Sequence, residues 1–199
     1  MLQRIYLPNS ITALTQVKSL TFFKKDKWFM SQRYWLMKSE PDCFSFADLC
    51  AAPDQTNPWD GVRNFQARNF LRDEIQVGDG VLFYHSNVAQ PAIVGLAQVV
   101  RAGYPDHTAQ DPRSDHSDPR ATAQNPIWYM VDVRAVAPIE QPLTRTDLAR
   151  HPLLSGMGVM RRGNRLSVQP VTAAEFAMVL TLAGLEDAFT VTADVREPQ

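Results

Sequence analysis

Two tryptophan-containing strings near the start of the folded part of the chain hold the side chains best suited to chemistry. They read YWLMKSEP over residues 34–41 and WDGVRN over residues 59–64. Trp59 lies between Pro58 and Asp60-Gly61, so we expect its ring in a loop at the wall of a cavity. There its face would give about 1–3 kcal/mol of stacking to a nucleobase. Lys38 and Ser39 can supply hydrogen bonds to the edge of such a ring, so this combination predicts binding of a flat polar ring.

An enzyme is one alternative to a binding module. A nucleophilic enzyme needs a serine or cysteine in a strained turn with a histidine nearby, and the sequence has no GxSxG motif. His85 and Ser86 are adjacent, and neighbouring strand residues point to opposite faces, so the pair is poorly placed for proton transfer. We therefore expect no catalytic residue.

A metal site is a second alternative, because one segment is rich in acids and histidines. Its candidate ligands are Asp106, His107, Asp111, Asp115, His116 and Asp118. Their spacing matches no helical HExxH pair, EF-hand loop or Cys/His knuckle, so solvation of a surface loop explains them. Cys43 and Cys50 lie seven residues apart with no histidine at ligand spacing, and both are expected to be reduced. We expect neither a metal nor a cofactor.

Arginines indicate where phosphates could bind. Arg63 precedes a predicted helix, and Arg68 and Arg72 lie four residues apart on one face of it, so we assign these three to phosphate contacts. A second cluster precedes the last predicted strand and consists of Arg161, Arg162 and Arg165. The domain is net negative, so we expect a local patch beside a pocket and no wide electrostatic footprint.

Length and composition predict one domain with an added N-terminal segment. The chain has 199 residues, of which 45% are hydrophobic and 21% charged. Residues 1–30 carry a net charge of +4, although the whole chain carries −1, and Met30 reads as a translation start ahead of the first strand. We expect residues 1–30 to be an extension outside the fold, with a targeting peptide as the alternative. No apolar run approaches the roughly 20 residues that span a bilayer, which favours a cytoplasmic protein without membrane contacts.

Short apolar runs bounded by turn residues predict a mostly antiparallel sheet. Strands are expected over residues 34–37, 81–84, 93–100, 128–136 and 166–168. Capping boxes at Ser45 and Thr172 predict helices through Cys50 and Leu182, and Asn64 is expected to cap a helix over residues 65–74. Residues 53–58 and 104–125 are expected to be loops, and the second is a long loop at the surface. Trp35 and Trp128, in strands, are expected to lie in the core.

Seven strings occur in order between about Tyr34 and Leu182: YWLMKSEP, WDGVRNFQARNFLR, FYHSN, VGLAQV, YPDHT, NPIWYMVDV and RLSVQPVTAAEF. Together they resemble the EVE-domain family. The resemblance implies the PUA-like fold, an α+β domain built on a mostly antiparallel β-barrel of five or six strands with short flanking helices. The domain would cover residues 31–186, and residues 187–199 would form a C-terminal tail.

The resemblance also implies a pocket for a modified base of DNA or RNA. Its residues in this sequence would be Lys38 and Ser39 at the polar edge, Trp59, Gly61, Val62 and Asn64 on one wall, and Tyr84, His85 and Ser86 on the opposite side. The expected function is a non-catalytic nucleic-acid-binding module that reads a modified base. Two alternatives would use the same pocket: an enzyme acting on a modified base or nucleotide, and a small-metabolite sensor, which the acidic net charge would suit.

Overall fold

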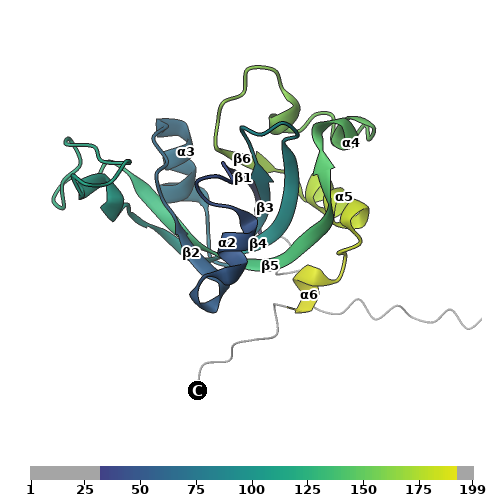
Figure 1. Ribbon diagram of the computed structural model, residues 1–199, viewed down its shortest axis with the longest axis horizontal. Coiled ribbons are helices and arrows are strands. Elements are labelled where there is room, and N and C mark those ends of the chain that lie inside the picture. The colour runs from purple at the N-terminus through teal and green to yellow at the C-terminus, as the bar shows by residue number, and fades with distance from the viewer. Residues whose placement is uncertain (1–31, 192–199) are drawn as a thin grey trace, which may run out of the picture. The chain divides into compact units, whose positions relative to one another are not determined.

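A six-stranded mixed sheet carries the fold of residues 32–191, the part of the chain that this computed structural model describes (Figure 1). Its strands are β1 (Tyr34–Ser39), β2 (Thr56–Trp59), β3 (Gly80–His85), β4 (Ala92–Pro105), β5 (Tyr129–Thr144) and β6 (Val168–Val171). They lie in the order β2-β5-β4-β3-β1-β6, and every pairing is antiparallel except that of β1 with β3. The predicted α+β class and mostly antiparallel sheet are confirmed. The prediction for residues 1–30 lies outside the described residues.

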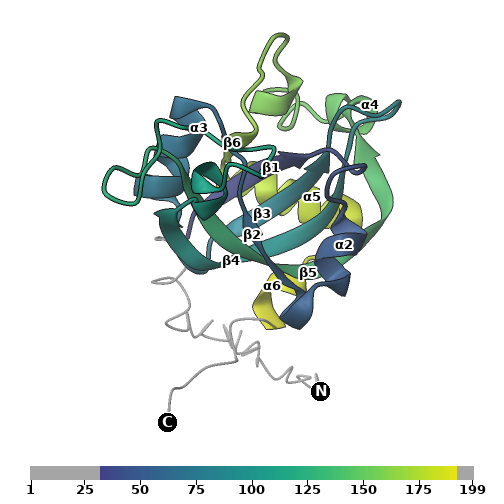
Figure 2. The same cartoon turned by 60° about the vertical axis from the view of Figure 1, so that its left-hand side comes forward.

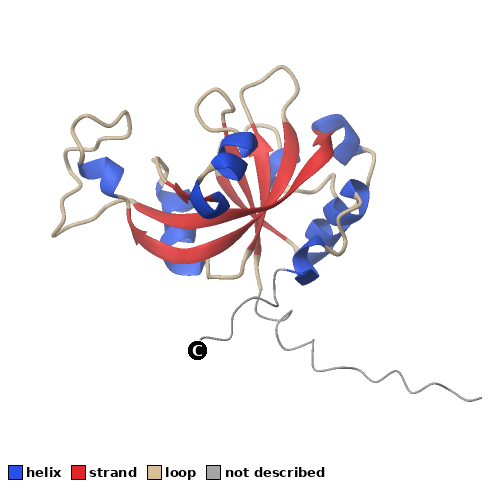
Figure 3. Cartoon of the chain, turned by 60° about the horizontal axis from the view of Figure 1, so that its bottom comes forward, coloured by secondary structure: helices blue, strands red, loops and turns tan. Residues whose placement is uncertain are grey.

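The sheet is strongly curved, and the helices are arranged around it (Figure 3). Strands β2 and β6 form the two ends of the hydrogen-bonded order. Within residues 32–191, no strand pairing joins these two ends. The predicted closure into a barrel therefore stays a prediction.

Alternation along the central strands gives the sheet two apolar faces. Trp35 and Met37 of β1 lie in one buried cluster, which we call the Trp35 core, together with Phe83 of β3. Tyr34, Leu36 and Tyr84 lie in a second cluster, the Tyr34 core. Successive side chains of a strand point to opposite faces, so a strand buried on both faces is apolar throughout. The runs YWLM and VLFY have this character.

Each core is covered by different helices. α2 (Phe46–Ala51) and α3 (Phe65–Asn69) contribute Phe46, Leu49 and Ala67 to the Trp35 core. α4 (Arg145–Ala149) and α5 (Ala173–Ala183) contribute Leu148, Phe176 and other side chains to the Tyr34 core. In Figure 2, α2 lies in front of the sheet and α5 behind it. A short helix, α6 (Ala188–Val191), begins the predicted tail, and no helix of residues 32–191 has the length and apolar character needed to cross a membrane.

The helix caps follow the sequence closely. The Ser45 hydroxyl accepts a hydrogen bond from the Asp48 N–H, and the Asp48 carboxylate accepts one from the Ser45 N–H, which is a complete capping box. Thr172 and Glu175 make the same arrangement at α5, and Gly184, with φ of 66°, ends that helix. These two predicted helices are confirmed, because local side chains satisfy backbone groups that every helix end exposes.

The helix predicted over residues 65–74 covers the predicted residues, but only its first half is α-helical. Asn64 Oδ1 accepts from the N–H groups of Gln66 and Ala67, and α3 then continues as a π-helical turn over Phe70–Glu74. Strand β4 approaches this turn closely at Gly103, where an added Cβ would lie 2.3 Å from the Leu71 carbonyl oxygen. The sequence contains no local signal for this widening.

Three sequence predictions were wrong in position. Residues 56–59, expected in a loop, form β2 and pair with β5, so Trp59 is a buried strand residue with 6% of its surface exposed. The closing strand lies at Val168–Val171, two residues later than predicted. The segment 104–125 is not only a solvated loop, because β4 extends to Pro105, a 3-10 helix follows at His107–Gln110, and the carboxylate of Asp106 is buried.

Candidate functional site

The parallel pairing of β1 with β3 brings two of the predicted strings together at one edge of the sheet. In this register Lys38 lies beside Tyr84, and Ser39 lies beside His85. Ser86 extends the contact, since its N–H donates to the Ser39 carbonyl oxygen over 2.8 Å and its hydroxyl donates to the same oxygen over 3.2 Å. Residues expected on opposite sides of a pocket therefore lie side by side on neighbouring strands, although they are more than forty residues apart in the sequence.

Side-chain alternation divides these residues between the two faces of the sheet. The Ser39 hydroxyl donates to the Phe44 carbonyl oxygen over 2.6 Å, beside the Trp35 core. On the other face, Tyr84 is buried in the Tyr34 core, and the Lys38 Nζ donates to the Asn164 carbonyl oxygen over 3.3 Å. Lys38 and Ser39 are thus adjacent in sequence but have separate surroundings.

An aromatic cluster surrounds Phe83 on the Trp35 side. The rings of Phe46, Trp59 and His85 lie edge-on to Phe83, with centroids 5.3, 5.1 and 5.7 Å away, and Phe44 lies 6.3 Å away. Phe83, Phe46 and Trp59 are buried, whereas Phe44 and His85 are half-buried and form the outer part. Trp59 and His85 therefore both lie against the ring of Phe83.

His85 is held as a neutral imidazole in this cluster. Its Nε2 accepts a hydrogen bond of 3.1 Å from the N–H of Phe46, so the ring proton is on Nδ1. Burial lowers the pKa of His85 and outweighs the opposing effect of Asp48. No partner for the Nδ1 proton lies among the residues that the structure describes, so this group can donate to a ligand.

The Lys38 side of the edge carries concentrated positive charge. Burial, followed by the nearby guanidinium of Arg145, lowers the pKa of Lys38. Burial also raises the pKa of Tyr84, and Arg145 opposes that rise. Lys38, Tyr84 and Arg145 therefore share one electrostatic environment.

The second predicted string forms the turn from β2 into α3. Gly61 has φ of 71°, its N–H donates to Asp106 Oδ2 over 3.2 Å, and an added Cβ would lie 2.8 Å from His116 Nε2. Val62 is buried in the Trp35 core, and the side chain of Asn64 is used as the helix cap. This string sets the path of the chain beside Trp59.

The three arginines assigned to phosphate contacts already have partners in the protein. Arg63 makes an ion pair of 2.8 Å with the buried Asp106, and its guanidinium also donates to the His116 carbonyl oxygen. Arg68 Nη1 donates to the Ile127 carbonyl oxygen over 2.6 Å, and Arg72 pairs with Asp73 over 2.7 Å. These contacts compete with phosphate for the same donors.

Asp106 is the hub of the first of these contacts. Burial alone would raise the pKa of Asp106, but hydrogen bonds from Thr108 and Arg63 hold it below its ordinary value. Its carboxylate joins the segment 104–125 to the turn at Gly61. The sequence analysis attributed this carboxylate to a solvated surface loop, whereas in the structure it is buried and bonded to Gly61, Arg63 and Thr108. Within residues 32–191, no group of three His, Cys, Asp or Glu side chains could hold a metal ion.

The sequence did not predict a cleft between the start of α3 and the segment 104–128. It has a volume of about 360 Å³ and is lined by Arg63, Phe65, Asp115, His116, Ser117, Asp118, Arg120 and Trp128. Phe65 is 53% exposed and stacks on the buried Trp128, with centroids 4.9 Å apart. Asp118 accepts from Arg120 and from Trp128 Nε1, and these bonds lower its pKa. The sequence signal for this cleft was Phe65, an aromatic residue directly after the helix cap Asn64.

Comparisons with known proteins match most of the described residues. The EVE domain matches residues 33–182. Thymocyte nuclear protein 1 of Danio rerio is 44% identical over 165 residues, which are 74% of this chain and 71% of that protein. A hypothetical protein from Leishmania major, 46% identical, has a similar structure with a TM-score of 0.73, covering 78% of this chain and 96% of that one.

A further solved structure is that of the human THYN1 protein in complex with 5-methylcytosine containing DNA. It is 40% identical to this chain, with a TM-score of 0.71, and the match covers 84% of this chain and 100% of that chain. The family match runs from the start of β1 to the last turn of α5. This chain belongs to the EVE-domain family.

Proposed function

We propose that this chain is a non-catalytic reader of a modified base in DNA, and that the base is 5-methylcytosine. The observation that carries the proposal is the human THYN1 structure with 5-methylcytosine containing DNA, whose match covers 84% of this chain. A modified base in RNA is the second candidate ligand, because the same edge groups can bind either nucleic acid. Family membership also supports a PUA-like barrel as the closed form of the curved sheet. A cytoplasmic location stays a prediction.

In this proposal the base binds where the edge of β1 and β3 meets the Phe83 cluster. His85 donates from Nδ1 to the base edge, and the oxygen of the Ser39 hydroxyl, whose proton is donated to Phe44, accepts a second hydrogen bond. Phe44 and Trp59 supply aromatic surface, although a base that stacks on Trp59 must displace side chains that now leave the ring 6% exposed. Extrusion of the base costs a few kcal/mol, so single-stranded or mismatched sites should bind more tightly than a paired site.

The methyl group sets the expected size of the preference. Burial of one methyl group contributes about 0.8 kcal/mol, which corresponds to a roughly fourfold lower Kd. A larger preference would require that cytosine leaves a poorly filled space at the methyl position.

The test is fluorescence anisotropy with labelled oligonucleotides of one sequence that carry either 5-methylcytosine or cytosine at a single position. Wild-type protein should prefer the methylated oligonucleotide by about fourfold or more. His85→Ala should reduce this preference, and His151→Ala, outside the predicted pocket, is the matched control. Equal affinity of the wild type for the two oligonucleotides would overturn the reader proposal. Mass spectrometry of the oligonucleotide after incubation with the protein would detect conversion of the methylated base. Such conversion would show that the protein is catalytic and would overturn that part of the proposal.

A further inference from the structure

The loop between the 3-10 helix Gly158–Met160 and β6 is fixed by its own hydrogen bonds. Asn164 Nδ2 donates to the Gly158 carbonyl oxygen over 2.9 Å, and Asn164 Oδ1 accepts from the Leu166 N–H over 3.1 Å. The backbone turns at Gly163, with φ of 81°. This loop projects from the upper side of the domain in Figures 1 and 2. Its side chains are therefore displayed on a defined backbone.

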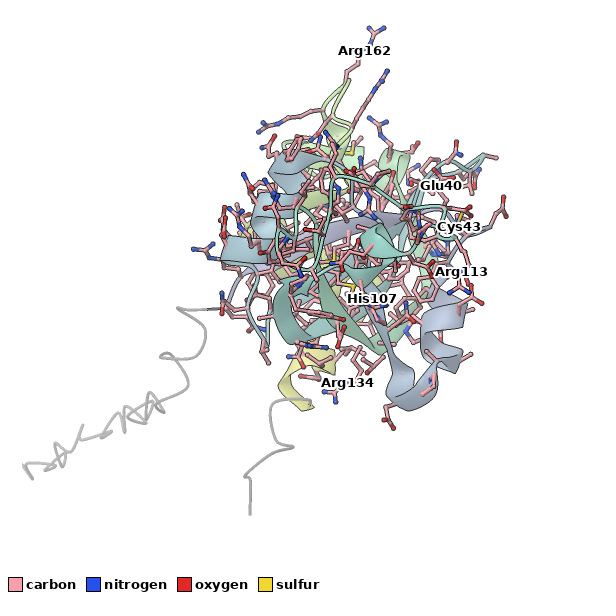
Figure 4. All side chains as sticks on the ribbon, turned by 90° about the vertical axis from the view of Figure 1, so that its left-hand side faces the viewer. Glu40, Cys43, His107, Arg113, Arg134 and Arg162 are labelled. Atoms are coloured by element: carbon pink, nitrogen blue, oxygen red, sulfur yellow. The ribbon has the colours of Figure 1, made fainter. Side chains whose placement is uncertain are left out.

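Three of those side chains are arginines without carboxylate partners. Arg161, Arg162 and Arg165 are exposed, and within residues 32–191 no ion pair or side-chain hydrogen bond engages any of them. Arg162 points away from the domain in Figure 4. By contrast, Arg63 and Arg72 are both bound to carboxylates. Three like charges within five residues repel one another unless an anion binds them.

Two more cations connect this loop to the candidate site. The Lys38 Nζ donates to the Asn164 carbonyl oxygen over 3.3 Å, and Arg145 donates to the Met160 carbonyl oxygen over 3.2 Å. In addition, the Lys38 N–H donates to the Ser167 carbonyl oxygen over 2.8 Å. The loop therefore lies at the same end of β1 as Ser39, where the base is proposed to bind, and a strand could reach both by passing over this end of the sheet.

We propose that Arg161, Arg162 and Arg165 bind the phosphates of the nucleic-acid strand whose modified base enters the candidate site. This inference rests on the proposed function and reassigns the phosphate contacts from α3 to the loop before β6. A guanidinium presents a planar fork of donors that matches phosphate oxygens, and these three forks are available. The chain has a net charge of −1, so a local patch is the expected form of contact with a polyanion.

The experiment measures binding of the methylated and unmethylated oligonucleotides by the double variant Arg161→Gln/Arg162→Gln over a range of salt concentrations. The control is Arg33→Gln/Arg134→Gln, which removes the same charge elsewhere, although Arg33, unlike the loop arginines, pairs with a carboxylate, that of the exposed Glu74. Arg33 lies at the opposite end of β1 from Lys38, and Arg134 lies far from Arg162 in Figure 4. All the arginines changed are on the surface or partly exposed, so thermal melting should show intact folds.

We expect the loop variant to bind both oligonucleotides about three- to tenfold more weakly, with an unchanged ratio between them. The slope of log K against log salt should become shallower by about one to two. The control should keep both the affinity and the slope.

If the loop variant binds like the control while the wild type still prefers the methylated oligonucleotide, the arginine assignment is wrong and the reader proposal stands. If the wild type shows no preference but the loop variant loses affinity and slope, the reader proposal fails and the arginine assignment stands. If the wild type binds neither oligonucleotide, both are overturned.

Discussion

The Nε2 atom of His85 accepts a hydrogen bond of 3.1 Å from the backbone N–H of Phe46, the first residue of α2. This bond ties the end of β3 to the start of a helix and requires a neutral imidazole. Protonation of Nε2 would remove the acceptor and leave the N–H without its partner. The bond therefore makes the stability of the domain depend on pH.

We predict that the free energy of unfolding decreases in acid through His85. The pKa of His85 is lowered in the fold, so the unfolded chain takes up a proton at a higher pH than the folded one. This contribution is complete above the unfolded pKa of about 6.5 and is lost as the pH falls through the lower folded value. Urea unfolding at pH 7.5 and 5.5 should show a larger loss for the wild type than for His85→Gln. An equal loss in both proteins would contradict the assignment, because other groups titrate in both.

Replacement of the buried carboxylate at position 106 should destabilise the domain. Asp106→Asn removes the charge that binds Arg63 and weakens the bond to the Gly61 N–H, so we expect a loss of about 2–3 kcal/mol at pH 7. Asp111→Asn is the matched control, because Asp111 pairs with an Arg113 side chain that is 90% exposed. That exposed pair should contribute little to stability, because solvent screens it. Equal losses in urea unfolding would show that Asp106 has no special role.

Trp59 should matter for folding as well as for binding. Its ring is buried against Phe83, so Trp59→Ala should cost about 3–5 kcal/mol. Phe65→Ala, at a ring that is 53% exposed, should cost about 1 kcal/mol or less. Thermal melting of the two variants distinguishes these positions. A small effect at Trp59 would mean that the ring is not part of the core, and Trp59→Phe is the better variant for binding studies.

The close approach of β4 to the π-helical turn should not tolerate a side chain. In Gly103→Ala the new Cβ would lie 2.3 Å from the Leu71 oxygen and 3.0 Å from Arg72 Cα, and both are backbone atoms. We expect a loss of about 1–3 kcal/mol or more. Gly156→Ala, where no atom lies within 4 Å, should change the stability by less than about 1 kcal/mol in either direction. A neutral Gly103→Ala would show that the two segments can separate without cost.

The predicted boundary at the N-terminus can be tested directly. A chain that starts at Met30 should fold and melt at the same temperature as the full chain, because the seven family-like strings all lie after that residue. Circular dichroism during heating is sufficient. A large loss of stability would show that residues 1–29 belong to the fold.

Features fixed by neighbouring residues could be predicted from the sequence, and features fixed by distant ones could not. The caps at Ser45, Asn64 and Thr172 were predictable because each side chain binds a backbone group two or three residues away. Strand β2 was missed because its sequence, TNPW, contains a proline, and its partner β5 begins seventy residues later.

In the candidate site, too, contacts between distant residues could not be predicted from the local sequence. The family resemblance implied that Ser39 and His85 lie on opposite sides of one pocket, whereas the register places them side by side on neighbouring strands. The ion pair of Arg63 with Asp106 joins residues 43 positions apart, so nothing in the local sequence indicated that this arginine was already engaged. Phosphate contacts were assigned to arginines at helical spacing, which describes a helix face but not the groups opposite it.

The alternation at the end of β1 also constrains how this strand can change. Lys38 and Ser39 face opposite sides because they occupy successive positions of a strand whose register with β3 runs from Tyr34 to Ser39. If Tyr34 and Trp35 keep their places, insertion or deletion of one residue between Trp35 and Lys38 would exchange the sides of Lys38 and Ser39. The number of residues in this strand is therefore as strict a requirement as the identity of its polar residues.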